Sequence, residues 1–321
     1  MARRTFDETM QSDEHGRTVS GGSGPFVALA LVWGSAFVAI KAGLEYFPPV
    51  LYAALRYELA ALLVLVYAYA TTDRWAPRGR AEWLSVAVAG TFVYGGYHAF
   101  LFVGQQHATS AVAAVLVSSI PILTVGFARL FLPDERLNAT GVLGLVVSFV
   151  GVSLVARPDV GGLLAGRASG EVLIVAAAVC TAVGSVFAQR FSVDLPLATR
   201  QAWAMGLGAV VLQAASLGRS ESFASIRWTP EAVGWLAYLV VFPSALGFLL
   251  YFALLERRGS IETNLVVYAS PVFAALIGWV LLGEPLTALT LVGFIVIVAG
   301  FGLTKWEVLR ERVPGVLNVR F

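Results

Sequence analysis

The chain has 321 residues, of which 58% are hydrophobic and only 13% are charged, and its mean hydropathy is +0.78. This composition excludes a soluble globular domain and indicates a protein of the lipid bilayer. The formal net charge is only +2 and no basic domain is present, so the sequence excludes a nucleic-acid-binding function as well.

Residues 1–24 are rich in charged side chains and end in Gly-Gly-Ser-Gly, which predicts a disordered cytoplasmic tail. The apolar run that follows is too long for the core of a signal peptide, and we interpret it as a retained helix. A helix needs about 20 residues to cross the hydrocarbon core, and ten runs have roughly that length. These runs cover approximately 26–47, 50–70, 83–104, 108–132, 137–156, 172–191, 196–218, 232–255, 260–283 and 287–304.

Lysine and arginine residues between these runs are distributed unequally over the two sides of the predicted membrane. With the N-terminus in the cytoplasm, fifteen of them lie on the cytoplasmic side and four on the opposite side. The positive-inside rule therefore predicts a multi-pass protein of the plasma or inner membrane with both termini in the cytoplasm.

Two apolar stretches, 116–151 and 266–300, read as one sequence written twice. They share a proline in mid-segment, an acidic residue in a short turn and two glycines seven residues apart. The matched residues are Pro121 with Pro271, Glu135 with Glu284, Gly144 with Gly293, and Gly151 with Gly300. Each half of the chain contains five runs, which is an odd number, so the second half enters the membrane from the opposite face and the duplication is an inverted repeat.

The sequence therefore predicts an all-α membrane protein of ten transmembrane helices, arranged as two five-helix inverted repeats. Such repeats can rock against each other around a central site, which favours transport. Proline kinks a helix and frees a carbonyl, so Pro121 and Pro271 are candidate gating residues, although they could simply bend their helices. The predicted units are the first repeat at 25–157, an extracytoplasmic linker at 158–170, the second repeat at 171–304 and a cytoplasmic C-terminal tail at 305–321.

Three charged side chains within the apolar runs are candidates for binding, coupling or gating, because a charge at bilayer depth is costly unless it has a partner or faces water. Lys41 and Arg56 are predicted at similar depths and could recognise an anionic group. Alternatively, Lys41 pairs with Glu45 and Arg56 ties helices together through carbonyl groups. Glu58 is a candidate proton-coupling residue, or it neutralises a cation on a neighbouring helix.

Polar and aromatic residues near the middle of the runs are candidates for substrate binding. An aromatic ring with a polar tip suits a cavity that holds a partly apolar ligand. Ordinary helix packing is the alternative interpretation. The candidates are Trp33, Tyr94, Tyr97, His98, Ser118, Asn264 and Tyr268. The paired glycines on the fifth and tenth runs predict close helix packing, either within one chain or at a homodimer interface.

Several short motifs resemble EamA-type members of the drug/metabolite transporter superfamily. They are WGSAFVAIKAGLEYFPPVLYAALRYELAALLV at 33–64 and the turns LPDERL and LLGEPL. The resemblance covers roughly residues 26–304, and it implies a ten-helix carrier of small metabolites, often an exporter. It also implies a central cavity lined by the first, third and fourth helices of each half. The second half departs from this pattern, because it has no tryptophan before Gly184 and no lysine that matches Lys41.

We therefore expect a secondary transporter that moves an amino-acid-like or amphipathic metabolite by alternating access, with export preferred through the family resemblance. Protons or a counter-substrate are the expected coupling partners. A membrane-embedded enzyme, or a lipid or drug translocase that uses the same cavity, is the alternative. The three histidines (His15, His98 and His107) have no metal-ligand spacing, and the single Cys180 lies in an apolar run, so no metal, disulfide or other cofactor is expected.

Overall fold

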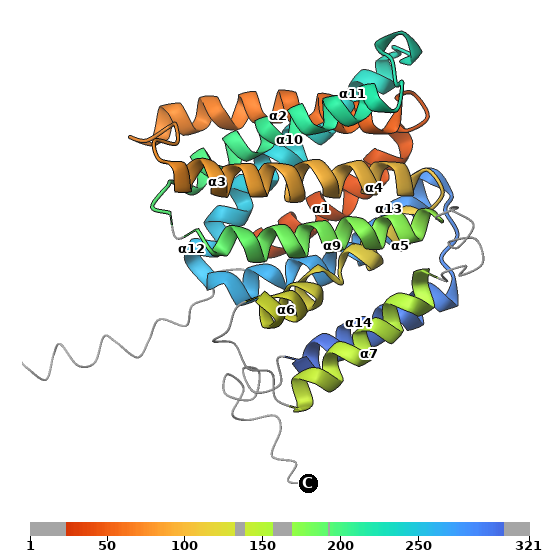
Figure 1. Cartoon of the computed structure of the whole chain (residues 1–321). Helices are drawn as coiled ribbons and strands as arrows, with labels where there is room; N and C mark the ends of the chain where they lie inside the picture. The colour runs from red at the N-terminus through yellow and green to blue at the C-terminus, as the bar shows by residue number, and fades with distance from the viewer. Residues whose placement is uncertain (1–23, 132–138, 157–168, 192, 305–321) are drawn as a thin grey trace, which may run out of the picture.

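A computed structural model describes residues 24–131, 139–156, 169–191 and 193–304 of this protein. These residues form a bundle of helices, and no strand occurs among them (Figure 1). The predicted all-α class is therefore confirmed. The predicted tails and most of the linker, with Glu135, lie outside the described residues.

The helices follow the predicted runs with few exceptions. The third run of each half is one long rod, and a π-helical segment interrupts each rod. In the first half the elements are α1 (Gly24–Gly43), α2 (Pro49–Thr71), α3 (Arg80–Val88), η1 (Ala89–Gly96), α4 (Tyr97–Gln105), α5 (Ser110–Val117), α6 (Ile120–Phe131) and α7 (Ala139–Ala156). In the second half they are α9 (Gly170–Gln189), α10 (Leu197–Gly218), the short 3-10 turn η2 (Phe223–Ser225), α11 (Pro230–Leu239), η3 (Val240–Leu246), α12 (Gly247–Asn264), α13 (Val266–Leu282) and α14 (Ala288–Thr304).

The run at 108–132 is two helices rather than one helix kinked at Pro121. The break lies at Ser118 and Ser119, whose hydroxyls donate to the Val115 and Leu116 carbonyls at 2.6 Å each. Pro121 has no N–H to continue the upstream helix, and it becomes the second residue of α6, where a missing donor costs nothing. Pro271 instead lies inside α13.

Two further boundaries differ from the sequence-based expectation. The rod α11–η3–α12, which corresponds to the eighth run, ends at Asn264 rather than near residue 255, and α13 begins at Val266 rather than at residue 260. As a result, Pro271 is in the second turn of its helix and not at the centre of a longer one. The end of an apolar run is a poor guide here, because α12 continues as a helix through its charged last turns.

Six helical spans of the described residues are long and apolar enough to cross a membrane, and three further apolar helices are shorter. Large apolar side chains are exposed along the outer faces of the bundle, for example Val146 on α7 and Ile295 on α14. Exposed apolar surface of this extent is costly in water and favourable against lipid tails. The protein is therefore a multi-pass membrane protein.

Helices from the two halves pack in matching pairs (Figure 1). The second helix of each half packs on the other, as α2 with α10, and the fifth helices pack in the same way, as α7 with α14. The first helix of the chain, α1, contacts α13 and the rod α11–η3–α12. Its counterpart α9 contacts α5 and α6 and the rod α3–η1–α4.

Glycine determines how closely these pairs approach. A Cβ atom on Gly144 of α7 would lie 2.5 Å from the Gly300 carbonyl oxygen of α14, and one on Gly151 would lie 2.9 Å from that of Gly293. Real Cβ atoms do not come so close, so only glycine permits this contact. The glycines noted in the sequence therefore form an interface within one chain. Nothing in this contact requires a second copy.

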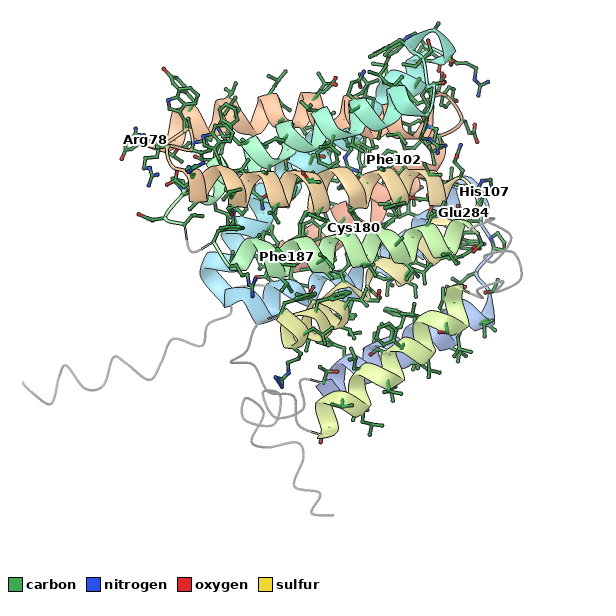
Figure 2. All side chains as sticks on the ribbon, viewed as in Figure 1. Arg78, Phe102, His107, Cys180, Phe187 and Glu284 are labelled. Atoms are coloured by element: carbon green, nitrogen blue, oxygen red, sulfur yellow. The ribbon has the colours of Figure 1, made fainter. Side chains whose placement is uncertain are left out.

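The ends of the bundle are identified in Figure 2, where Arg78 and His107 lie at opposite ends of the rod α3–η1–α4. Phe187 lies on the Arg78 side of Cys180, so α9 runs antiparallel to that rod. Glu284 lies at the same end as His107. The turn between α4 and α5 and the turn between α13 and α14 therefore meet at one end of the bundle.

Candidate functional site

A cavity of about 380 Å³ lies in the middle of the bundle. Its walls come from both halves of the chain, chiefly from the first and third helices of each half, with α2, α5, α10 and α13 completing them. Five of the predicted site residues line it. They are Trp33, Arg56, Tyr94, Tyr97 and His98. A volume near 400 Å³ is in the range of pockets that hold small organic molecules.

The two π segments, η1 and η3, both contribute to the wall of this cavity. In η3, Pro243 supplies no backbone N–H, and the Ser244 hydroxyl donates to the Leu239 carbonyl at 2.9 Å. In η1, Gly90 and Gly95 lie against α10, where Gly208 leaves room for Tyr94. A π segment widens one turn of a helix and often occurs at functional sites. Here η1 contributes Tyr94 and η3 contributes Pro243 to the cavity wall.

Arg56 is the charged residue of the cavity wall. It is only 5% exposed, and its Nε donates to the Ser244 hydroxyl at 2.9 Å. The Ser244 hydroxyl donates its own hydrogen bond to the Leu239 carbonyl, so its oxygen is the acceptor for Arg56 and its orientation is fixed. The guanidinium carbon lies 5.0 Å from the centre of the Tyr57 ring. The sequence suggested that Arg56 ties helices together through backbone carbonyls, whereas its Nε donates to a side-chain hydroxyl of η3.

His98 is held by hydrogen bonds at both ring nitrogens. Its Nδ1 lies 2.9 Å from the Tyr94 carbonyl, which can only accept, so Nδ1 carries a proton. In the neutral ring Nε2 is then an acceptor, and the Tyr57 hydroxyl donates a hydrogen bond to it at 2.6 Å. Tyr94 in turn donates to Gln201 Oε1 at 2.6 Å. This chain of contacts fixes the aromatic side of the cavity.

Aromatic rings from the second half line another part of the cavity, next to Trp33 of α1. Trp33 stacks on Tyr251 at 5.6 Å between ring centres and meets Phe248 edge-on at 6.4 Å. Thr181 also lines the cavity, and its buried hydroxyl has no hydrogen-bond partner among the described residues. A buried hydroxyl normally has a partner, so this atom is available to a water molecule or a ligand.

Lys41 lies outside the central cavity, at the end of the bundle marked by His107 and Glu284 in Figure 2. Its Nζ donates to the carbonyls of Gln105 and Gln106 at 3.0 Å each, which are free at the C-terminus of α4. No ion pair with Glu45 forms among the described residues. Lys41 and Arg56 therefore do not form one cationic site, because Lys41 caps a helix.

Glu284 closes the same end of the bundle. Gly283 adopts φ +63° after the last residue of α13, which only glycine does without strain, and this turn folds Glu284 back. The carboxylate accepts from the Ser110 N–H at 2.9 and 3.1 Å, at the start of α5. The turn LLGEPL thus joins the two halves, with glycine for the turn and glutamate for the helix N-terminus.

Glu58 faces away from the cavity, because two residues along a helix correspond to a rotation of about 200° from Arg56. It lines an apolar groove between α2 and α10, with Trp203 and Gln213 on the opposite side. No ion pair forms between Glu58 and another described residue. The interpretation that Glu58 neutralises a cation of a neighbouring helix is therefore not supported, and its role in coupling stays a prediction.

The remaining predicted residues are not among those that line the cavity. Ser118 lies at the break between α5 and α6 and bonds to the Val115 carbonyl. The Tyr268 ring packs against Phe301 of α14 at 4.7 Å, and its buried hydroxyl has no partner among the described residues. The side chain of Asn264 lies outside the described residues. Pro121 and Pro271 act on their helices and not on the cavity wall, and their role as gates stays a prediction.

Several cavity residues were missed by the sequence-based reasoning. The most important are Tyr57, Thr181, Gln201, Pro243, Phe248 and Tyr251. Tyr57 directly follows Arg56 in the sequence. Pro243 is a proline inside an apolar run, so the reasoning applied to Pro121 and Pro271 could also have identified Pro243. Thr181, Phe248 and Tyr251 lie in largely apolar stretches of α9 and α12, where sequence spacing does not show which face meets the cavity.

Comparisons with known proteins support a transport role. A model of the EamA-like transporter family matches twice, at residues 23–157 and 168–306. An uncharacterized transporter of Archaeoglobus fulgidus is 29% identical over 272 residues, which cover 84% of this chain and 94% of that protein. The uncharacterized inner membrane transporter YedA of Escherichia coli is 28% identical over 288 residues, which cover 87% of this chain and 90% of that protein.

One solved crystal structure is similar in fold, with a TM-score of 0.65 over 91% of this chain and 99% of the other, at 20% identity. At that identity the similarity shows the fold alone. It agrees with the helical architecture described above.

Proposed function

This chain belongs to the EamA-like transporter family, and we propose on that premise that it is a secondary transporter that works by alternating access. Its substrate is a small, partly apolar metabolite that binds in the central cavity. The observation that carries the proposal is that one cavity of about 380 Å³ is walled by equivalent elements of both halves. Movement of one half against the other would change access to that cavity from each side.

The proposal includes ten membrane-spanning helices in two inverted repeats. The nine apolar spans and helices described above become ten when α10 is added, which has 22 residues and is less apolar because it carries Arg200, Gln201 and Gln213. The family model matches each half separately. Matched packing of α1 with α13 and of α9 with α5 and α6 supports a two-fold relation between the halves. Both termini are proposed to lie in the cytoplasm, and export is the proposed direction.

The end of the bundle that contains Lys41 and Glu284 is proposed to be the extracytoplasmic gate. Lys41 is bonded to the end of α4 and Glu284 to the start of α5, so both close the α4–α5 turn. Opening on that side would break these contacts while the contacts around Arg56 remain. Protons or a counter-substrate are the proposed source of energy.

Thiol labelling tests alternating access without knowledge of the substrate. The chain has one cysteine, so Cys180→Ser gives a cysteine-free background. In that background, Ser185→Cys places a thiol on the cavity wall. We expect a membrane-impermeant methanethiosulfonate reagent to modify it from either face of oriented vesicles.

Ser148→Cys is the matched control, because Ser148 is 1% exposed and is buried in the interface between α7 and α14. It should react from neither face. Reaction of the Ser185→Cys thiol from one face only would exclude alternating access under those conditions, and reaction from neither face would exclude an open cavity.

A further inference from the structure

Arg56 is a buried cation that no described residue neutralises. Its side chain donates one of its five N–H groups to Ser244, and no described residue accepts from either terminal nitrogen. The ion pairs among the described residues are Arg74 with Glu82 and Arg219 with Glu221, and neither involves Arg56. A buried charge without a counter-charge is costly, so its partner is expected to come from outside the protein.

The rest of the cavity wall carries no formal charge among the described residues. Its polar groups are hydroxyls, one glutamine amide, the Trp33 indole and the His98 ring, and the two hydrogen bonds of His98 suit the neutral imidazole. Glu58, the nearest carboxylate in the sequence, faces the groove between α2 and α10. Among the described residues that line the cavity, Arg56 alone carries a formal charge, and a ligand group with one negative charge would balance it.

The orientation of Arg56 favours a carboxylate in particular. Ser244 holds the Nε side of the guanidinium, and the Tyr57 ring lies 5.0 Å from its carbon. The two terminal nitrogens remain available, and they form a planar pair that matches the two oxygens of a carboxylate. Ser244 is itself fixed through the Leu239 carbonyl, so the guanidinium is held in place before a ligand arrives.

Another part of the cavity wall is suited to an apolar body. Trp33 contacts both Phe248 and Tyr251 there, and Phe37 and Ile40 also line the cavity. A zwitterion would bring an ammonium group, and no carboxylate is available to it among the described cavity residues. An acid without an ammonium group leaves no charge unpaired.

We propose that the central cavity binds a small organic monocarboxylate, with its carboxylate on the terminal nitrogens of Arg56 and its apolar or aromatic body against Trp33, Phe248 and Tyr251. This inference rests on the proposed function, because it names the substrate class of the same cavity. It narrows the sequence-based expectation of an amino-acid-like or amphipathic metabolite to acids with net negative charge.

Binding of four probes with the same phenyl-ethyl body tests the proposal on the purified full-length protein. They are hydrocinnamate (anionic), hydrocinnamamide (neutral), phenethylamine (cationic) and L-phenylalanine (zwitterionic). Isothermal titration calorimetry should show that hydrocinnamate binds about 10- to 100-fold more tightly than the amide, because hydrogen bonds to charged groups are the stronger ones. Phenethylamine should bind most weakly, and L-phenylalanine should bind more weakly than hydrocinnamate.

The variant Arg56→Gln should remove the preference for hydrocinnamate over the amide while the amide binds as before. The amide thus controls for damage to the cavity. Arg129→Gln is the matched variant, since it removes a cation in the last turn of α6 that does not line the cavity, and it should leave both affinities unchanged.

Three outcomes would overturn the proposal. The first is that hydrocinnamate binds no more tightly than the amide. The second is that L-phenylalanine or phenethylamine binds as tightly as hydrocinnamate. The third is that Arg56→Gln weakens the acid and the amide equally, which would make Arg56 a packing residue. None of these affects thiol labelling from both faces, so failure here and failure of the transport mechanism can be distinguished.

Discussion

Removal of the Glu284 carboxylate should weaken the contact between the two halves of the protein. In Glu284→Ala the Ser110 N–H loses its acceptor, and Ser110 is fully buried. A buried donor without a partner costs about 1 to 3 kcal/mol. Thr109 does not compensate for this loss, because its hydroxyl already accepts from the Val112 N–H at 3.3 Å.

The variant Glu284→Gln separates the hydrogen bond from the charge. The amide oxygen can still accept from Ser110, so the loss is that of a negative charge at a helix N-terminus, about 0.3 to 1 kcal/mol. The free energy of unfolding is measured by titration with sodium dodecyl sulfate in mixed micelles. We expect the alanine variant to be clearly less stable than the glutamine variant.

Glu231→Ala is the matched control, because Glu231 is an exposed glutamate in the first turn of α11. Its loss should change stability less than the loss of Glu284. Equal effects of Glu284→Ala and Glu284→Gln would show that the hydrogen bond contributes nothing. An effect of Glu284→Ala no larger than that of Glu231→Ala would refute the reasoning altogether.

Three further predictions concern packing, the cavity and coupling. Gly300→Val should destabilise the protein strongly, because its Cβ atom would overlap α7. Gly302→Val on the same helix places its Cβ atom in open space and should be tolerated. Equal loss of folded protein in the two variants would contradict this account of the interface. Tyr97→Ala should weaken ligand binding because Tyr97 lines the cavity, and Tyr268→Ala should not, as measured by ligand titration. If Glu58 carries the coupling proton, Glu58→Gln should abolish substrate flux driven by a pH gradient in proteoliposomes. Normal flux in this variant would exclude Glu58 as the coupling residue.

The fold was largely predictable from the sequence. In lipid, every backbone polar group needs a partner within the protein, so long apolar runs have to be helices. The duplicated stretches indicated two equivalent halves, and their paired glycines predicted that the fifth and tenth helices each pack closely against another helix. The structure shows that the partner is the other helix of the same chain, since α7 packs on α14.

The candidate site was predictable only in part. Trp33, Arg56, Tyr94, Tyr97 and His98 stand out because they are polar, charged or clustered within apolar runs, and all five line the cavity. Their unusual chemistry marks them wherever they lie along a helix. A tyrosine or phenylalanine without such neighbours, as at Phe248, carries no mark of this kind.

Tertiary structure alone decided the direction in which each side chain points. Lys41 and Arg56 were expected at one depth, yet Lys41 caps α4 while Arg56 faces the cavity. Glu58 faces the groove beside α2, and Tyr268 packs against α14. The physical reason is that helices in a bilayer are apolar towards lipid and towards one another. Periodicity along the chain therefore cannot distinguish the two faces, and only the contacts between helices can.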